Sequence, residues 1–148
     1  MLAKWLKSRL KGNSDVELVI DPEEEMLSGL NLKEVLDAHD AWKSKLAAEL
    51  SGASSEPIDA DIIASDCHCV LGKWLHGKGK KDYSKLSEYK MAVDAHAKFH
   101  QTAAEVVIQH QSGHTSQAKQ LLKTQFRSAS NDNQLELVRL FTAAKERK

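Results

Sequence analysis

The stretch "SEYKMAVDAHAKFHQTAAEVVIQHQ", residues 87–111, decides the fold, because it is the longest run with a helical repeat. Its inward positions recur at intervals of four and three residues, which is the period of an amphipathic helix. They are Tyr89, Val93, His96, His100, Ala103 and Val107. Gly113 follows the stretch, so we predict one long helix over 87–111. Two histidines therefore occupy a seam of otherwise apolar and aromatic side chains.

Three further windows carry the same repeat and predict helices at 31–50, 115–127 and 134–145. Asn31 and Asn131 stand at their N-cap positions, where an amide oxygen can accept from the first free backbone N–H groups. Four substantial helices with short connections predict an all-α fold, an antiparallel four-helix bundle.

Two shorter helices are expected between the first and second long ones. Asp59 can cap one that runs through Ala64, and another covers 70–76 and stops at Gly77. The bundle thus includes an extra short helix or two carrying a cysteine motif. We place the helical domain in residues 30–148, behind an amphipathic and extended segment at 1–29.

Composition narrows the class of protein. The chain has 148 residues with 21 basic and 21 acidic side chains, so it lacks the basic excess of a nucleic-acid-binding protein. Its two cysteines are too few for a disulfide framework and suggest a reducing compartment. We find neither a run of about 20 apolar residues nor the features of a signal peptide. A cytoplasmic protein is the expectation.

The stretch "DCHCVLGKWLHGKGKK", residues 66–81, concentrates metal-binding side chains. It contains both cysteines, Cys67 and Cys69, and lies between two predicted helices that carry inward histidines. One of these helices offers His39. The other offers His96 and His100, which are four residues apart and so share one face.

A histidine pair of this kind is by itself more often a surface or satisfied core pair than a metal site. Burying unpartnered imidazoles is costly, however, and a third inward histidine and a cysteine are at hand. Three histidines and one cysteine suit tetrahedral zinc, and four protein ligands leave no position for a reactive water. The set therefore predicts one zinc ion per chain in a structural or sensory site, and not an enzyme.

The arrangement resembles the chemoreceptor zinc-binding domain (CZB) family. "HDAW" at 39–42, "CVLGKW" at 69–74 and "HAKFH" at 96–100 follow one another in the family's order, separated by 26 and 21 residues. The resemblance covers roughly residues 30 to 145. It implies zinc ligands at His39, Cys69, His96 and His100, and a homodimer.

Other residues of these motifs have separate interpretations. Gly72 would let the cysteine segment pack closely, while Trp42 and Trp74 are expected in the core, shielding the metal. Cys67 lies outside the pattern, and Asp66 could cap a short helix or accept a hydrogen bond from a ligating histidine. The remaining histidines and the "GKGKK" segment are expected to be solvated. They are His68, His76, His110 and His114.

Three functions stay open. The resemblance implies a sensory module for zinc, or for oxidation of the zinc-bound cysteine, that acts on a chemotaxis or cyclic-di-GMP signalling partner in trans. A constitutive zinc-stabilised adaptor is the alternative. A di-iron carrier of the hemerythrin type is disfavoured, because such sites need inward carboxylates.

Residues 1–12 form a basic amphipathic pattern with Leu2, Trp5, Leu6 and Leu10 on one face. A helix of this kind can lie on an anionic membrane. Packing against the domain or a second subunit is the preferred interpretation, since the helix is short and acidic residues follow it.

Overall fold

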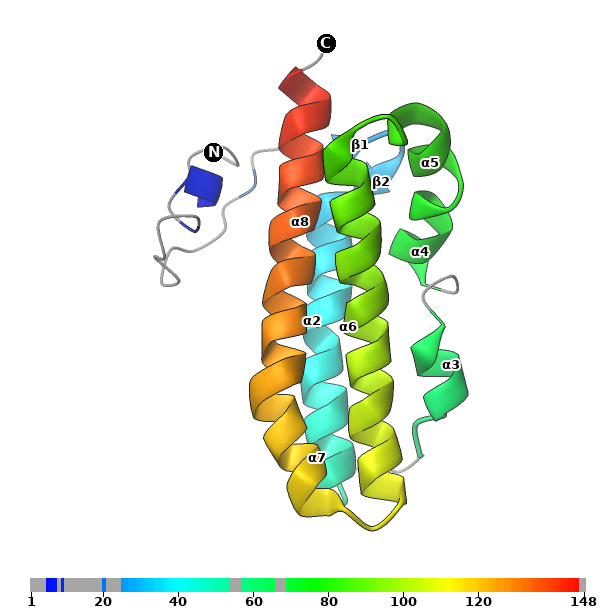
Figure 1. The fold of residues 1–148 in the computed structure, drawn as a ribbon, viewed down its shortest axis with the longest axis vertical. Coiled ribbons are helices and arrows are strands. Elements are labelled where there is room, and N and C mark those ends of the chain that lie inside the picture. The colour runs from blue at the N-terminus through cyan, green and yellow to red at the C-terminus, as the bar shows by residue number, and fades with distance from the viewer. Residues whose placement is uncertain are drawn as a thin grey trace.

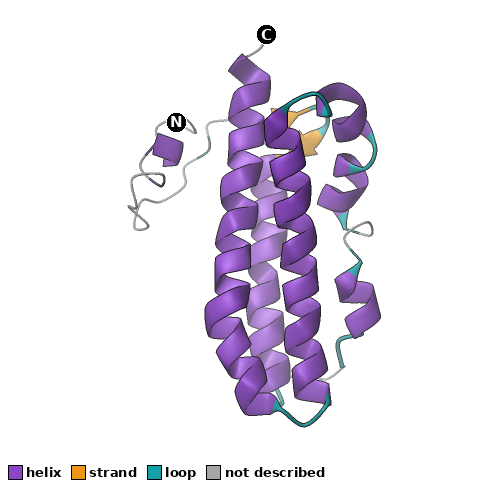
Figure 2. Cartoon of the chain, in the orientation of Figure 1, coloured by secondary structure: helices purple, strands orange, loops and turns teal. Residues whose placement is uncertain are grey.

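The structure, a computed structural model, describes residues 5–7, 9, 20, 25–53, 57–65 and 69–146. The regular elements of the described part are helices apart from one small hairpin, and loops join them (Figure 2). The long helices are α2 (Leu32–Leu50), α6 (Ser87–Gln111) and α8 (Arg127–Glu146). Between α2 and α6 come the short helices α3 (Ala60–Ala64), α4 (Val70–Leu75) and α5 (Lys78–Tyr83).

These elements form an antiparallel bundle of four segments. Three of the segments are long helices, and the fourth consists of the short helices α3, α4 and α5, which we call the broken leg. Figure 1 shows α2 and α6 running in the same direction, α3, α4 and α5 leading back along α6, and α8 returning on the other side. The prediction of an all-α bundle with short helices around the cysteine motif is therefore confirmed. The broken leg puts the cysteine-bearing segment at mid-height, beside the long helices.

The C-terminal third departs from the sequence prediction. The expected helices at 115–127 and 134–145 are one unbroken stretch of α7 (Thr115–Leu121), the π-helical turn η2 (Leu122–Phe126) and α8. Asn131 therefore lies inside a helix and does not cap one. The reason is packing: Ala129, Ser130 and Asn133 are buried on the inner face of α8, and tertiary contacts override the weak helix propensity of such residues.

The "GKGKK" segment, expected as a solvated turn, is exposed apart from Gly79, but it is helical and does not form a turn. Helix α5 begins after Gly77 and covers the other four residues, and Gly79 is buried against Trp74. A Cβ at position 79 would stand 2.7 Å from Trp74 ring carbons, so only glycine allows this approach. The glycine-rich composition here reflects close packing and not a loop.

A two-residue hairpin, β1 (Met26–Leu27) and β2 (Leu30–Asn31), precedes α2. Its turn includes Gly29 with a φ of 85°, a conformation that suits glycine. Leu27 and Leu30 are buried in the core. The turn adjoins the boundary that the sequence predicts between 1–29 and 30–148. That division of the chain remains a prediction.

The described residues of the N-terminal helix pack on the bundle. Trp5 is 3% exposed, and Leu6 packs against the same core cluster. The guanidinium of Arg9 lies 5.3 Å from the centroid of the Trp5 ring. Packing on the domain, the interpretation that the sequence favours, therefore describes this part of the segment.

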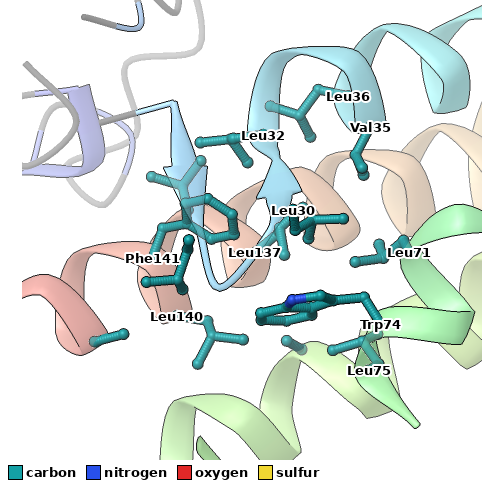
Figure 3. Close-up of a cluster of buried hydrophobic side chains, with 14 of the residues drawn as sticks. Leu30, Leu32, Val35, Leu36, Leu71, Trp74, Leu75, Leu137, Leu140 and Phe141 are labelled. Carbon is teal, nitrogen blue, oxygen red and sulfur yellow. The ribbon is translucent and has the colours of Figure 1, made fainter. Parts of the chain in front are cut away.

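The core consists of two hydrophobic clusters stacked along the bundle. The upper cluster joins the hairpin, α2, α4 and α8, and includes Leu30, Trp74 and Phe141 (Figure 3). The lower cluster surrounds Phe99 and Phe126, whose ring centroids are 5.2 Å apart. On both α2 and α6, the histidines lie between residues of the upper and of the lower cluster.

Among the described residues, no helix combines the length and the apolar composition that crossing a membrane requires.

Candidate metal centre

Helix α6 supplies two histidines that meet inside the bundle. His96 is fully buried and His100 is 3% exposed. Their Nε2 atoms are 3.1 Å apart, and the ring centroids are separated by 4.6 Å. The four-residue spacing thus produces what the sequence predicted, two imidazoles presented to one point.

Helix α2 brings His39 to the same point. Its ring centroid lies 5.3 Å from that of His96 and 5.9 Å from that of His100. Burial lowers the pKa of His39, and the neighbouring His100 lowers it further, although the hydrogen bond to Val35 opposes the shift. His39 is therefore held in its neutral form, the form that binds a metal.

Cys69 supplies the fourth donor atom. It is the N-cap residue of α4, and its Sγ accepts a hydrogen bond of 3.3 Å from the backbone N–H of Gly72. The same sulfur lies 3.2 Å from Nε2 of His96 and 3.6 Å from Nε2 of His100. The broken leg of the bundle therefore delivers the thiol directly onto the histidine cluster.

Backbone carbonyls fix the orientation of two of the histidines. Nδ1 of His39 is 2.8 Å from the carbonyl oxygen of Val35, and Nδ1 of His100 is 2.8 Å from that of Ile63. A carbonyl only accepts, so each Nδ1 must be the protonated nitrogen. In the neutral ring Nε2 then carries a lone pair. Such contacts are typical of the outer shell of a metal site.

The donor atoms fit a tetrahedral zinc ion. Zinc binds histidine at about 2.05 Å and cysteine at about 2.3 Å, so the edges of a tetrahedron are about 3.3 Å between nitrogens and about 3.6 Å between nitrogen and sulfur. The two Nε2 atoms of His96 and His100 are 3.1 Å apart, and the Cys69 sulfur lies 3.2 and 3.6 Å from them. One donor atom from each of these residues and His39 lies within 4.8 Å of the others. The four residues could therefore hold one ion.

One side of the cluster opens into a cavity of about 540 Å³ between α2 and α4. His39 and Cys69 line it, together with half-buried Trp42 and the exposed side chains of Met26 and Val70. Cys69 is the least buried of the four donor residues. The cavity thus borders Cys69 and His39, whereas His96 and His100 are not among the residues that line it.

This combination defines a class of protein, an all-helical domain with a closed site of three imidazoles and one thiol for a single metal ion. Residues 39–107 match the family model described as the chemoreceptor zinc-binding domain. This part of the chain is therefore a chemoreceptor zinc-binding domain, and the resemblance seen in the sequence is confirmed. Comparison with curated proteins and with solved structures gave no match.

The domain identifies zinc as the metal, with one site formed by the described residues. Chemoreceptor zinc-binding domains are regulatory zinc-binding domains and not a known catalytic family. Among the described residues, the buried carboxylates are those of Glu49 and Glu136, and neither residue belongs to the metal cluster. Within the part of the chain that the structure describes, the cluster therefore contains no carboxylate of the kind that a di-iron site uses.

Several other predicted residues take different places. Trp74 is buried as expected, and its Nε1 donates to the Ser28 carbonyl at 3.0 Å. Trp42 is half-buried and packs against the lower hydrophobic cluster, with the Lys45 ammonium 4.6 Å from its ring centroid, so it lies at the edge of the core and not inside it. The predictions for Asp66, Cys67 and His68 lie outside the described residues.

The other three histidines of the described residues are not part of the cluster. His76 and His114 are exposed, in agreement with the sequence prediction. His110 is half-buried, and its Nδ1 is 3.0 Å from the Thr115 hydroxyl. The carbonyls of Val35 and Ile63 that contact the histidines were not predicted from the sequence, because every residue has a backbone carbonyl and the residue type does not show which one makes such a contact.

Proposed function

We propose that the chain is a zinc-binding sensory module in which His39, Cys69, His96 and His100 hold one zinc ion. The observation that carries this proposal is the unequal exposure of the donors. The one sulfur is half-buried and borders a cavity, whereas the three histidines are buried. A purely structural site has no need to leave its most oxidisable ligand accessible.

The chemistry of sensing follows from the state of the sulfur. Cys69 would be deprotonated when it binds a zinc ion here, and a thiolate is the form that oxidants attack. With hypochlorous acid, the Cys69 sulfur takes up the oxygen as S–OH, gives two electrons to chlorine, and chloride leaves. The sulfenic acid is a poorer donor, so three histidines remain to hold the ion.

Two segments depend on the cluster for their position. Helix α4 begins at Cys69, whose side chain is both its N-cap and a donor of the cluster. Helix α3 is tied to His100 through the Ile63 carbonyl. We infer that loss of zinc or oxidation of Cys69 frees α3 and α4, while α6 stays folded between its two hydrophobic clusters.

Hydrogen exchange tests this switch on zinc-bound, chelated and oxidised protein. Protection is expected to fall in residues 57–65 and 69–83 and to persist in residues 87–111. A Cys69→Ser variant serves as the control, since hypochlorous acid should cause no further change in it. Equal loss of protection across all helices would instead favour the second candidate function, a constitutive zinc-stabilised adaptor.

The output of the module is proposed to lie in a signalling partner of the chemotaxis or cyclic-di-GMP type. We also propose a homodimer, which the family resemblance implies. A cytoplasmic location is proposed because two cysteines that form no disulfide framework are typical of a reducing compartment. Nucleic acid is not expected as a partner, given the balance of 21 basic and 21 acidic residues. Membrane attachment through residues 1–12 is the less favoured option, as Trp5 packs on the bundle.

A further inference from the structure

Helices α4 and α5 carry a concentration of lysines at one end of the bundle. Residues 73–85 contain five lysines, which are all exposed and which we call the lysine patch: Lys73, Lys78, Lys80, Lys81 and Lys85. The one acidic residue in this range is Asp82. Because the whole chain has 21 basic and 21 acidic residues, the positive charge of the patch is local and is balanced elsewhere.

The packing of α5 leaves its lysines in solvent. Gly79 faces the Trp74 ring, where a larger side chain would clash. Tyr83 packs against the upper hydrophobic cluster, and its hydroxyl lies 2.6 Å from that of Ser28 in the hairpin. The helix is therefore fixed through its glycine and its tyrosine, and its charged side chains take no part in the packing.

The charges of the lysine patch are not neutralised within the described part of the chain. The ion pairs between described residues join Lys33 to Asp37 and Arg139 to Glu136, and neither pair involves the patch. The Asp82 carboxylate accepts a hydrogen bond of 2.9 Å from the Ser28 hydroxyl. Neighbouring ammonium groups repel one another, so an anionic surface placed against them would be attracted by the whole patch.

Exposed apolar side chains lie beside the lysine patch. Val70 is 71% exposed and stands three residues before Lys73, on the same face of α4. Met26 is 48% exposed and lines the same cavity as Val70. Lysines next to exposed apolar side chains are the combination with which protein segments bind the interface of an anionic membrane.

The residue type of the patch favours a lipid surface over a nucleic acid or a folded protein. Residues 66–90 contain no arginine. Lysine is a hydrated point charge on a flexible stem, whereas the planar fork of arginine is preferred where phosphate or carboxylate groups have fixed positions. Lipid headgroups move within the bilayer, so flexible lysines can follow them.

We propose that the lysine patch binds the anionic cytoplasmic face of a membrane, with Val70 and Met26 at the interface. Such leaflets attract polybasic segments electrostatically. Figure 1 shows α5 and the hairpin at the end of the bundle opposite to α7, so α7 would face away from the lipid. This contact goes beyond the proposed function, because it involves none of the four metal-binding side chains.

Co-sedimentation of the full chain with vesicles tests the proposal. At low ionic strength the wild-type protein should bind vesicles of phosphatidylcholine mixed with phosphatidylglycerol, bind pure phosphatidylcholine far more weakly, and dissociate as salt is added. Each lysine near an anionic surface strengthens binding about fivefold, so K78Q/K80Q/K81Q should lower the partition coefficient about a hundredfold.

The matched control is K119Q/K123Q/R127Q, which removes three positive charges at the opposite end of the bundle (Figure 1). These side chains are exposed and spaced four residues apart. Because charges beyond a Debye length are screened, the control should change the partition coefficient by less than about threefold.

Several results would overturn the proposal: no binding of the wild type to the mixed vesicles, equal binding to both kinds of vesicle, or equal losses in the two triple variants. Binding to double-stranded DNA or polyglutamate through the patch, without binding to vesicles, would also overturn it and assign the patch to an acidic macromolecule. Zinc content is measured in the same samples and should be one ion per chain in every variant. Its absence from the wild type would overturn the proposed function and leave the lipid contact unaffected.

Discussion

Replacement of His96 by alanine is the perturbation whose effect can be worked out most directly. His96 is fully buried, and its Nε2 lies 3.1 Å from that of His100 and 3.2 Å from the Cys69 sulfur. Structural zinc sites contribute roughly 10–16 kcal/mol of apparent binding free energy, or about 3 kcal/mol for each of four ligands. Since 1.4 kcal/mol is tenfold, H96A should weaken zinc binding by at least about a hundredfold.

The assay is competition for zinc against a chromogenic chelator at neutral pH. The control variant is H110A, on the same helix. His110 is half-buried, lies outside the cluster and contacts the Thr115 hydroxyl, so its loss should change the zinc dissociation constant by less than about twofold. If H110A released zinc as readily as H96A, the assignment of the ligands would be wrong.

Three further changes probe the surroundings of the site. In D59A, helix α3 loses the side-chain cap on the N–H groups of residues 61 and 62, which weakens the contact between the Ile63 carbonyl and His100. Chelator competition should show a loss of zinc affinity of about tenfold. Unchanged affinity would contradict the role of α3 in orienting His100. In G79A, the new Cβ meets the buried Trp74 ring, and denaturant unfolding should show a loss of about 1–3 kcal/mol; wild-type stability would refute the close contact. Burial raises the pKa of the Glu136 carboxyl group, so the folded state favours its protonated form and the stability of the wild-type protein should fall as pH rises through that pKa. E136Q replaces the carboxyl group by a neutral amide. The variant should therefore lack this decline and unfold at a higher denaturant concentration than the wild type at neutral pH.

The sequence was sufficient for the parts of the fold that follow a helical period. Helix α6 spans the predicted residues 87–111, and Asn31 caps α2 by accepting from the Glu34 N–H at 2.9 Å. Asp59 likewise caps α3. In these places local chemistry and tertiary packing point to the same structure, so either one suffices to predict it.

The errors occur where tertiary packing decides. Residues 128–133 have a composition typical of caps and turns, yet the burial of Ala129 and Asn133 keeps them helical. Gly79 resembles a loop residue until Trp74 lies against it. The hairpin at 26–31 is too short to show a period of two.

The proximity of the four donor residues was predictable. The helical period places the three histidines on the inward faces of their helices, and the family motif adds Cys69 to them. Their support was not. The Ile63 carbonyl reaches His100 across 37 positions of sequence, and the cavity beside Cys69 arises from the separation of α2 and α4. Both properties depend on the path of the broken leg, which local patterns do not specify.

X-ray absorption at the zinc edge of the purified wild-type protein tests the central claim most directly. The expected spectrum contains one sulfur at about 2.3 Å and three nitrogens at about 2.0–2.1 Å, with about one zinc per chain. In the Cys69→Ser variant the sulfur shell should vanish. A wild-type site with two sulfurs, or with none, would contradict the assignment of His39, Cys69, His96 and His100 as the zinc ligands.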